Sequence, residues 1–265
     1  MRPAVATALA LLIGAGGCGD DEGGSVRSGD VTGGTVDRGA REGRLQSRPT
    51  RRRPDAEKAG LQELSVGSEG KGLLLVPAGY APARPAPLVV VLHGAGSGAR
   101  GGLAPLRELA DDAGLMLLAP KSRGQTWDVI EGGFGPDVAV LDALLAHVFR
   151  RYAVDLERIA LGGFSDGASY ALSLGLSNGD LFTHLIAFSP GFMAPGPKRG
   201  RPLIYVSHGV EDEVLPIESC SRRLVPALRR GGYHVHYREF GGGHTVPAPV
   251  ARAAVTWLRR GGDRR

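Results

Sequence analysis

Short runs of consecutive apolar residues recur from about residue 61 onward, and stretches with helical spacing of apolar positions separate them. The runs are predicted to be strands over residues 73–76, 88–92, 115–118, 158–161, 185–188, 203–206 and 233–240. Several contain no alternating polar residue, which is typical of strands covered on both faces. The helical stretches lie around 102–113, 137–151, 167–177, 217–230 and 247–260. This alternation predicts an α/β fold with a mostly parallel central sheet and helices on both faces.

The same pattern divides the chain into three regions. Residues 1–17 combine a basic start at Arg2, an apolar stretch and a run of small residues before Cys18, as in a signal peptide for export. Residues 18–60 contain almost no large apolar side chain, so they cannot bury enough surface to offset the entropy of ordering, and we expect a disordered Gly/Arg-rich tether. Residues 61–265 form the expected domain, which is large enough for one hydrophobic core.

The cysteine that follows the small residues gives the export signal a second feature. It resembles the bacterial lipoprotein signal, in which the cysteine is acylated and becomes the mature N-terminus, although Ala15 stands where that signal usually has a larger aliphatic residue. The resemblance implies an exported protein held on a membrane surface by acyl chains on Cys18. The alternative is an ordinary secretory signal, which leaves the protein secreted or periplasmic and Cys18 without a role.

Composition and charge exclude several classes of protein. The two cysteines, Cys18 and Cys220, cannot make a disulfide scaffold or a zinc cluster, and no apolar run reaches the roughly 18 residues of a membrane-spanning helix. The formal net charge is +5, but from Leu61 onward 22 Lys and Arg stand against 19 Asp and Glu. Because these basic residues are dispersed and no aromatic residues are interleaved with them, we expect no nucleic-acid partner.

A Gly-x-Ser-x-Gly motif lies between a predicted strand and a predicted helix. It reads Gly163-Phe164-Ser165-Asp166-Gly167 and follows the apolar run that ends at Leu161. This strand-turn-helix context is that of a nucleophile elbow, in which the serine occupies a strained turn and glycines two residues away avoid collision with neighbouring backbone. Ser165 is therefore the candidate nucleophile, and the alternative is a serine that only caps the helix.

A serine nucleophile needs a base, and the base needs an orienting carboxylate. His244 follows the last predicted strand in the loop Phe240-Gly241-Gly242-Gly243-His244. Three acids, Glu211, Asp212 and Glu213, follow the strand before it, and spacing alone does not choose among them. The order serine, acid, histidine agrees with a triad of the hydrolase type. His234 and His236 share a strand face but have no third ligand, so no metal is expected.

The turn after the strand 88–92 is the third candidate element, with the sequence His93-Gly94-Ala95-Gly96-Ser97-Gly98. Serine hydrolases place one oxyanion-hole amide in such a turn and the other on the residue after the nucleophile, which gives Ala95 and Asp166. The turn also fits a loose dinucleotide fingerprint, with Lys121 and Arg123 as phosphate ligands. That alternative leaves the serine, acid and histidine unexplained, so we expect no cofactor.

Taken together, these motifs resemble one branch of a known superfamily. The stretch 87–258 is similar to the phospholipase/carboxylesterase and polyhydroxybutyrate-depolymerase-like esterases of the α/β-hydrolase superfamily. The matching pieces are Leu-His-Gly-Ala-Gly at 92–96, Thr-Trp-Asp at 126–128, Asp-Val at 137–138, Gly-Phe-Ser-Asp-Gly at 163–167, His-Gly-x-x-Asp-x-x-Leu-Pro at 208–216 and Gly-Gly-His at 242–244. The resemblance singles out Asp212, because the family's carboxylate stands four residues after the histidine of its His-Gly motif.

The resulting expectation is a serine esterase that acts on a small or polymeric ester through an acyl-enzyme. A peptidase on the same fold and a noncatalytic lipoprotein binding module are the alternatives. Trp127, in the loop after the strand 115–118, is a candidate wall of the substrate pocket, and packing in the core is the alternative for this side chain.

Overall fold

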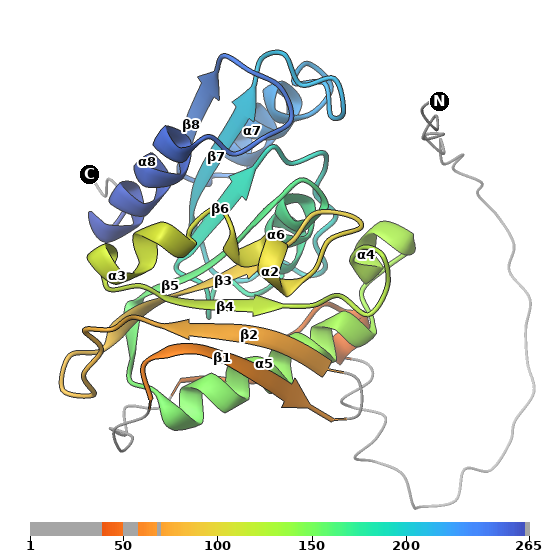
Figure 1. Ribbon diagram of the computed structural model, residues 1–265. Helices are drawn as coiled ribbons and strands as arrows, with labels where there is room; N and C mark the ends of the chain where they lie inside the picture. Colours follow the sequence, from red (N-terminus) through yellow and green to blue (C-terminus); the bar gives the residue numbers. More distant parts are fainter. Residues whose placement is uncertain (1–38, 50–57, 68–69, 263–265) are drawn as a thin grey trace, which may run out of the picture.

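The computed structural model describes residues 39–49, 58–67 and 70–262. The expected signal peptide, Cys18 and the first part of the expected tether lie outside these ranges. One eight-stranded sheet with the order β1-β2-β4-β3-β5-β6-β7-β8 organises the described residues; Figure 1 shows it from β1 at the bottom to β8 at the top. The strands are β1 (Gly60–Val66), β2 (Gly70–Val76), β3 (Ala86–Leu92), β4 (Met116–Pro120), β5 (Val154–Phe164), β6 (His184–Phe188), β7 (Leu203–Gly209) and β8 (Val235–Phe240).

Most neighbouring strands run parallel. All pairs from β4 through β8 are parallel, whereas β2 pairs antiparallel with both β1 and β4. The sheet is therefore mixed and mostly parallel, which confirms the expected fold class. Parallel strands end at a common edge, where ligand sites of such sheets gather, and the loops after β3, β5, β7 and β8 all leave from that edge.

Helices cover both faces of the sheet. They are α2 (Ala99–Leu103), the 3₁₀ turn η1 (Arg107–Leu109), α3 (Ala110–Ala113), α4 (Asp128–Glu131), α5 (Pro136–Arg151), α6 (Asp166–Ser177), α7 (Ser221–Arg230) and α8 (Ala248–Arg259). Leu88 and Val90 pack into the core layer shared with α5, α6 and α7, whereas Val89 and Val91 pack into the layer shared with α8 and the segment 99–113. All of β3 is buried as a result, which explains its uninterrupted apolar run.

The helix expected over 102–113 is instead divided into α2, η1 and α3. Pro105 follows the end of α2 and cannot donate a backbone hydrogen bond in a continuing helix. Gly102 packs against β3 so closely that a Cβ atom would lie 2.7 Å from the carbonyl oxygen of Val91. This contact holds the start of the segment against the sheet.

Strand β1 was not expected from the pattern of apolar runs. It is an edge strand that buries Leu64 while Leu61 remains 38% exposed. An edge strand with one covered face needs few apolar residues, and its Leu-Gln-Glu-Leu sequence carries too little apolar character to stand out from the preceding tether.

The structure also differs from the expected tether at residues 39–49, which we call the N-terminal latch. Leu45 of the latch is fully buried in the core. Its amide donates to Oδ1 of Asn178 at 3.0 Å, and Arg44 forms two hydrogen bonds with the carboxylate of Asp180. The amides of residues 46 and 47 donate to Asp142 of α5. The packed part of the chain therefore begins before residue 61.

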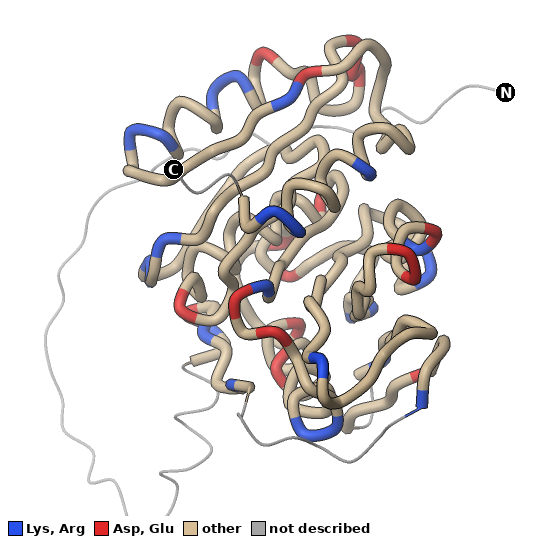
Figure 2. The backbone as a smooth tube through the Cα atoms, turned by 90° about the vertical axis from the view of Figure 1, so that its left-hand side faces the viewer, with Lys and Arg blue, Asp and Glu red and all other residues tan. Residues whose placement is uncertain are grey.

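Charge is dispersed over the described structure. Blue and red segments are interspersed along the tube in Figure 2, and no single basic stripe stands out in this view. No helix among residues 39–49, 58–67 and 70–262 is both long and apolar enough to cross a membrane. The same residues contain no group of three or more His, Cys, Asp or Glu side chains arranged to hold a metal ion.

Candidate active site

Ser165 lies in a strained turn between β5 and α6. Its φ of 59° and ψ of −120° are rare for a residue with a side chain. The Ser165 amide donates to the carbonyl of Phe188 at the end of β6, and the Ser165 carbonyl accepts from the amides of Ala168 and Ser169 in α6. The turn is therefore fixed to both the sheet and the helix, and it holds the serine at the edge where the parallel strands end.

The two glycines of the motif are required by close backbone contacts. A Cβ atom on Gly163 would lie 2.8 Å from the carbonyl oxygen of Leu92, and one on Gly167 would lie 2.6 Å from that of His93 and nearer still to that of Leu92. Because backbone atoms of a central strand cannot yield cheaply, both positions need glycine. These backbone contacts are the collisions that the glycines two residues from Ser165 were expected to avoid.

Asp212 and His244 form a hydrogen-bonded pair at the same edge. Oδ2 of Asp212 lies 2.6 Å from Nδ1 of His244. Asp212 is only 5% exposed, whereas Glu211 and Glu213 on either side of it are exposed. Burial and the hydrogen bond to His244 thus single out Asp212 among the three acids, between which sequence spacing did not choose. Since an ionised carboxylate only accepts hydrogen bonds, Nδ1 carries the proton and Nε2 is the free, basic nitrogen.

The loops after β7 and β8 are hydrogen-bonded to each other, and this brings the pair together. The amide of Val210 donates to the carbonyl of Phe240 at 2.9 Å, and that of Glu211 donates to the carbonyl of Gly242 at 3.0 Å. At Gly209 a Cβ atom would strike the carbonyl of Gly242, so the two loops approach without a side chain between them. The acid and the histidine are consequently carried on one joined unit.

Several donors stabilise the ionised form of Asp212. Its Oδ1 accepts from the amides of Val214 at 3.0 Å and Leu215 at 2.8 Å. Burial opposes ionisation, but the hydrogen bond from Leu215 and the contact with His244 outweigh it and lower the pKa of the Asp212 carboxyl. Asp212 therefore remains a charged acceptor that can orient the imidazole of His244.

A second histidine, His208, contacts the same carboxylate from the interior. Its Nε2 lies 2.8 Å from the carbonyl of Leu215 and 3.2 Å from Oδ2 of Asp212, and its Nδ1 lies 2.7 Å from the hydroxyl of Ser221. Burial lowers the pKa of His208, which favours the neutral imidazole. The sequence placed His208 in the His-Gly motif but gave it no role. The signal for such a role in the sequence was the position of His208 at the end of a strand predicted to be buried.

The ring of Phe164, the residue before Ser165, packs against the imidazole of His244. The rings of Phe164 and His244 lie with centroids 4.6 Å apart and an interplanar angle of 36°. Phe164 directly precedes Ser165, so the imidazole lies over the nucleophile turn. Within the described residues the Ser165 hydroxyl forms no hydrogen bond to His244; contacts of this kind commonly tighten only when substrate binds.

The turn 93–98 lies directly against the nucleophile. A Cβ atom on Gly94 would lie 3.4 Å from Cβ of Ser165. Ala95 is exposed at the tip of the turn, and Asp166 begins α6, whose N-terminal amides point toward the edge of the sheet. No hydrogen bond to another part of the described chain occupies the amide of Ala95 or of Asp166. Within the described residues both amides therefore remain available to donate to a bound oxygen atom.

The buried side chains of His93 and Trp127 hold the turn 93–98 in place from the core. Nε2 of His93 accepts from the amide of Ser122 at 3.1 Å, and Nδ1 donates to the carbonyl of Gly94 at 2.8 Å. Burial lowers the pKa of His93. Trp127 is 1% exposed, donates its indole N–H to the carbonyl of His93 at 2.8 Å and stacks on Tyr170. The structure therefore places Trp127 in the core, not in the wall of an open pocket.

Two carboxylates hold the loop that contains Trp127. Asp137 accepts from the amides of Arg123 at 2.8 Å and Asp128 at 3.0 Å, and Asp128 accepts from those of Gly135 and Asp137. Burial and the nearby charge of Asp137 raise the pKa of Asp128 to about 6. Burial also raises the pKa of Asp137. The loop is thereby closed by hydrogen bonds that sequence reasoning did not anticipate.

A ladder of serines on α6 fixes the segment after β6. The hydroxyl of Ser169 accepts from the amide of Gly191 at 2.9 Å, and that of Ser173 accepts from the amide of Ala194 at 2.8 Å. Ser169 in turn donates to the carbonyl of Ser165 at 3.2 Å. The spacing of four residues from Ser165 to Ser169 and Ser173 was the signal in the sequence, since such residues share one helix face.

No protein-family model matches the chain, and no curated protein matches it in sequence. Solved structures do match. An esterase named PE8 is 26% identical with a TM-score of 0.59, and the match covers 76% of this chain and 99% of that one. A thermostable esterase is also 26% identical, with a TM-score of 0.63 and coverage of 76% and 62%. The Bacillus cereus carboxylesterase is 18% identical, with a TM-score of 0.57 and coverage of 73% and 95%. The described chain therefore has the fold of α/β-hydrolase esterases.

Proposed function

We propose that the protein is a serine hydrolase that cleaves carboxylic esters through an acyl-enzyme. The observation that carries the proposal is the hydrogen-bonded Asp212–His244 pair, whose carboxylate is buried, at the sheet edge that also holds Ser165 at φ 59°. The matches to solved esterases support the same reaction class. The family resemblance of the motifs at 92–96, 163–167 and 208–216 adds the finer expectation of a phospholipase/carboxylesterase-like or polyhydroxybutyrate-depolymerase-like enzyme.

In this mechanism Ser165 Oγ attacks the ester carbonyl while Nε2 of His244 takes its proton. Asp212 holds the proton on Nδ1 and stabilises the imidazolium. The amides of Ala95 and Asp166 donate to the oxyanion. Collapse of the intermediate breaks the ester C–O bond, and the alcohol leaves with the proton from Nε2. Water then attacks the acyl-enzyme by the same route and releases the acid and the free serine.

The test of catalysis combines a substrate and a label. Purified protein should release nitrophenol from 4-nitrophenyl acyl esters and react with a fluorophosphonate probe, and Ser165→Ala should lose both while unfolding at the same temperature. Ser189→Ala is a matched control, because Ser189 has a positive φ of 51° but is buried after β6. Retention of most esterase activity by Ser165→Ala would disprove the assignment.

The two alternatives give different results in the same assays. A peptidase would prefer aminoacyl amides to the corresponding esters. A noncatalytic binding module would neither turn over esters nor take the label. A screen across acyl chain length, aromatic esters and polyhydroxyalkanoate would then identify the substrate.

We further propose export and attachment of the protein to a membrane surface through acylated Cys18. The proposal is supported by the basic start, the apolar stretch and the small residues before this cysteine. Cells that express the full chain with an alkyne-tagged fatty acid should label it, and Cys18→Ser should remove both the label and membrane fractionation. An unlabelled protein in the soluble exported fraction would favour the ordinary secretory signal.

A further inference from the structure

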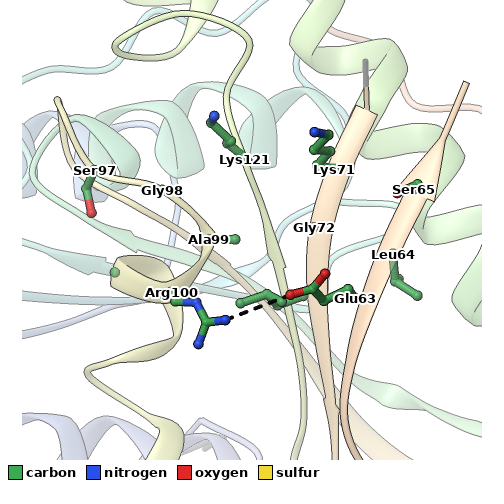
Figure 3. Close-up of a pocket in the computed structure, with 12 residues that line it drawn as sticks. Glu63, Leu64, Ser65, Lys71, Gly72, Ser97, Gly98, Ala99, Arg100 and Lys121 are labelled. Atoms are coloured by element: carbon green, nitrogen blue, oxygen red, sulfur yellow. Dashed lines mark ion pairs between the residues drawn. The ribbon is translucent and has the colours of Figure 1, made fainter. Parts of the chain in front are cut away.

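A cavity of about 610 Å³ lies beside the turn 93–98, within the size range of small-molecule sites. Its walls come from β1, β2, the turn itself, α2 and the residue after β4. Figure 3 shows Lys71 and Lys121 at one end, Ser97 at the side, and the Arg100–Glu63 ion pair at the other end. One end of the cavity is therefore cationic, and at the other end the charges of Arg100 and Glu63 cancel.

The two lysines face each other across antiparallel strands. Gly72 pairs with Pro120, and the next step places Lys71 opposite Lys121, whose amide donates to the Lys71 carbonyl at 2.9 Å. Side chains that are directly opposite share a face of the sheet, and like charges there repel. In the described part of the chain neither ammonium group has an acidic partner. A bound anion between them would remove the repulsion.

The cationic end is connected to the proposed catalytic residues. Ser97, in the cavity wall, donates its amide to the carbonyl of Gly94, which lies against Ser165. On the other wall Lys121 precedes Ser122, whose amide hydrogen-bonds to His93. Both walls are thus continuous with the turn that carries Ala95. A subsite in this cavity would require a substrate held at Ser165 to extend past this turn.

We propose that this cavity is a subsite for a carboxylate carried by the ester substrate, which Lys71 and Lys121 bind together. The inference deepens the proposed esterase function and rests on it. It assigns the substrate class as esters that have a negative charge away from the scissile bond. The hydroxyl of Ser97 and the backbone near Gly98 supply further polar groups along the wall.

The kinetic test compares charged esters with neutral esters of the same shape. Mono-4-nitrophenyl succinate and 4-nitrophenyl levulinate place the carboxylate or a ketone on the acyl side, and 4-carboxyphenyl and 4-acetylphenyl butyrate do so on the alcohol side. The protein should prefer the charged member of at least one pair, and 0.5 M salt should reduce the preference. Lys71→Gln/Lys121→Gln should reduce it by about tenfold. Lys198→Gln, an exposed lysine outside the cavity, should leave it unchanged.

Equal rates on both members of both pairs, or a preference that survives the double substitution, would overturn the subsite while leaving the esterase function in place. A direct measurement separates the two proposals. Ser165→Ala protein should bind 4-carboxyphenyl butyrate or mono-4-nitrophenyl succinate more tightly than its neutral counterpart, by calorimetry, and should lose this difference when both lysines are replaced. Binding that is indifferent to the lysines disproves the subsite, whereas absence of hydrolysis by the parent protein disproves only the reaction.

Discussion

The buried imidazole of His208 and the partly exposed imidazole of His244 both contact the same oxygen, Oδ2, of Asp212. Nε2 of His208 lies 3.2 Å from Oδ2, and Nδ1 of His244 lies 2.6 Å from it. Because the carbonyl of Leu215 can only accept, the proton of His208 is on Nε2. His208 therefore directs its Nε2–H to the Leu215 carbonyl at 2.8 Å and packs against Oδ2 of Asp212 at the longer distance of 3.2 Å, so it helps to position the carboxylate.

His208→Gln should lower kcat about tenfold with little change in KM, because Asp212 would be less well oriented while the substrate contacts remain. His234→Gln, at an exposed position, is the control. An unchanged kcat together with a lower yield of folded protein would indicate only a structural role.

Gly167→Ala should abolish activity, because its methyl group cannot fit against the carbonyls of Leu92 and His93 without displacing the nucleophile turn. Fluorophosphonate labelling and steady-state kinetics measure the loss. Gly79→Ala is the matched substitution, since a Cβ atom there has no neighbour within 4 Å. Wild-type labelling of Gly167→Ala would show that the turn tolerates a side chain.

Asp128→Asn should stabilise the protein at pH 8. Folding raises the pKa of Asp128 to about 6, so the stabilisation from its protonation is complete below about pH 4 and is lost as the pH rises through 6. An asparagine oxygen can still accept from the amides of Gly135 and Asp137 and carries no charge. We expect a gain of about 1 kcal/mol at pH 8, allowing for solvent screening.

Denaturant unfolding at several pH values tests this expectation. The gain should shrink toward zero near pH 4, where the parent carboxyl is also neutral. Asp112→Asn, on the exposed surface of α3, should change stability little at either pH. A gain that does not depend on pH would rule out ionisation of Asp128 as its cause.

Leu45→Ala should destabilise the domain by about 2–4 kcal/mol, the usual range for a fully buried leucine. Thermal or urea unfolding of the protein measures the change. Leu61→Ala, at a leucine that is 38% exposed, should cost well under half as much. Equal effects of the two substitutions would mean that the latch contributes no more than a surface segment.

The sequence predicted the parts of the fold that depend on strong local patterns. Uninterrupted apolar runs identified β3, β4 and β6, because strands covered on both faces consist mostly of apolar side chains. The elbow was predictable because its Gly-x-Ser-x-Gly pattern lies within one short segment between a strand and a helix, although the carbonyls that require its glycines belong to Leu92 and His93. Strand β1 was not, since an edge strand tolerates polar residues and owes its existence to pairing with β2.

Long-range contacts account for what the sequence could not predict. The buried position of Leu45 depends on Asn178 and Asp180, more than 130 residues away, so a lone leucine among Arg and Gly gave no signal. Trp127 could be placed on a loop but not assigned to the core, because that depends on Tyr170 and on the carbonyl of His93. Spacing alone could not choose Asp212 over its neighbours; the family resemblance singled it out, and its burial and its partner from another loop agree with that choice.

The N-terminal latch determines how a pull on the front of the chain would load the molecule. Force applied ahead of residue 39 reaches the contacts of Arg44 and Leu45 with residues 178 and 180, and those of residues 46 and 47 with Asp142 of α5, before it reaches β1. Several hydrogen bonds and the buried side chain of Leu45 must then yield before the force reaches the edge strand β1. The latch therefore separates mechanical load at the front of the chain from the edge strand of the sheet.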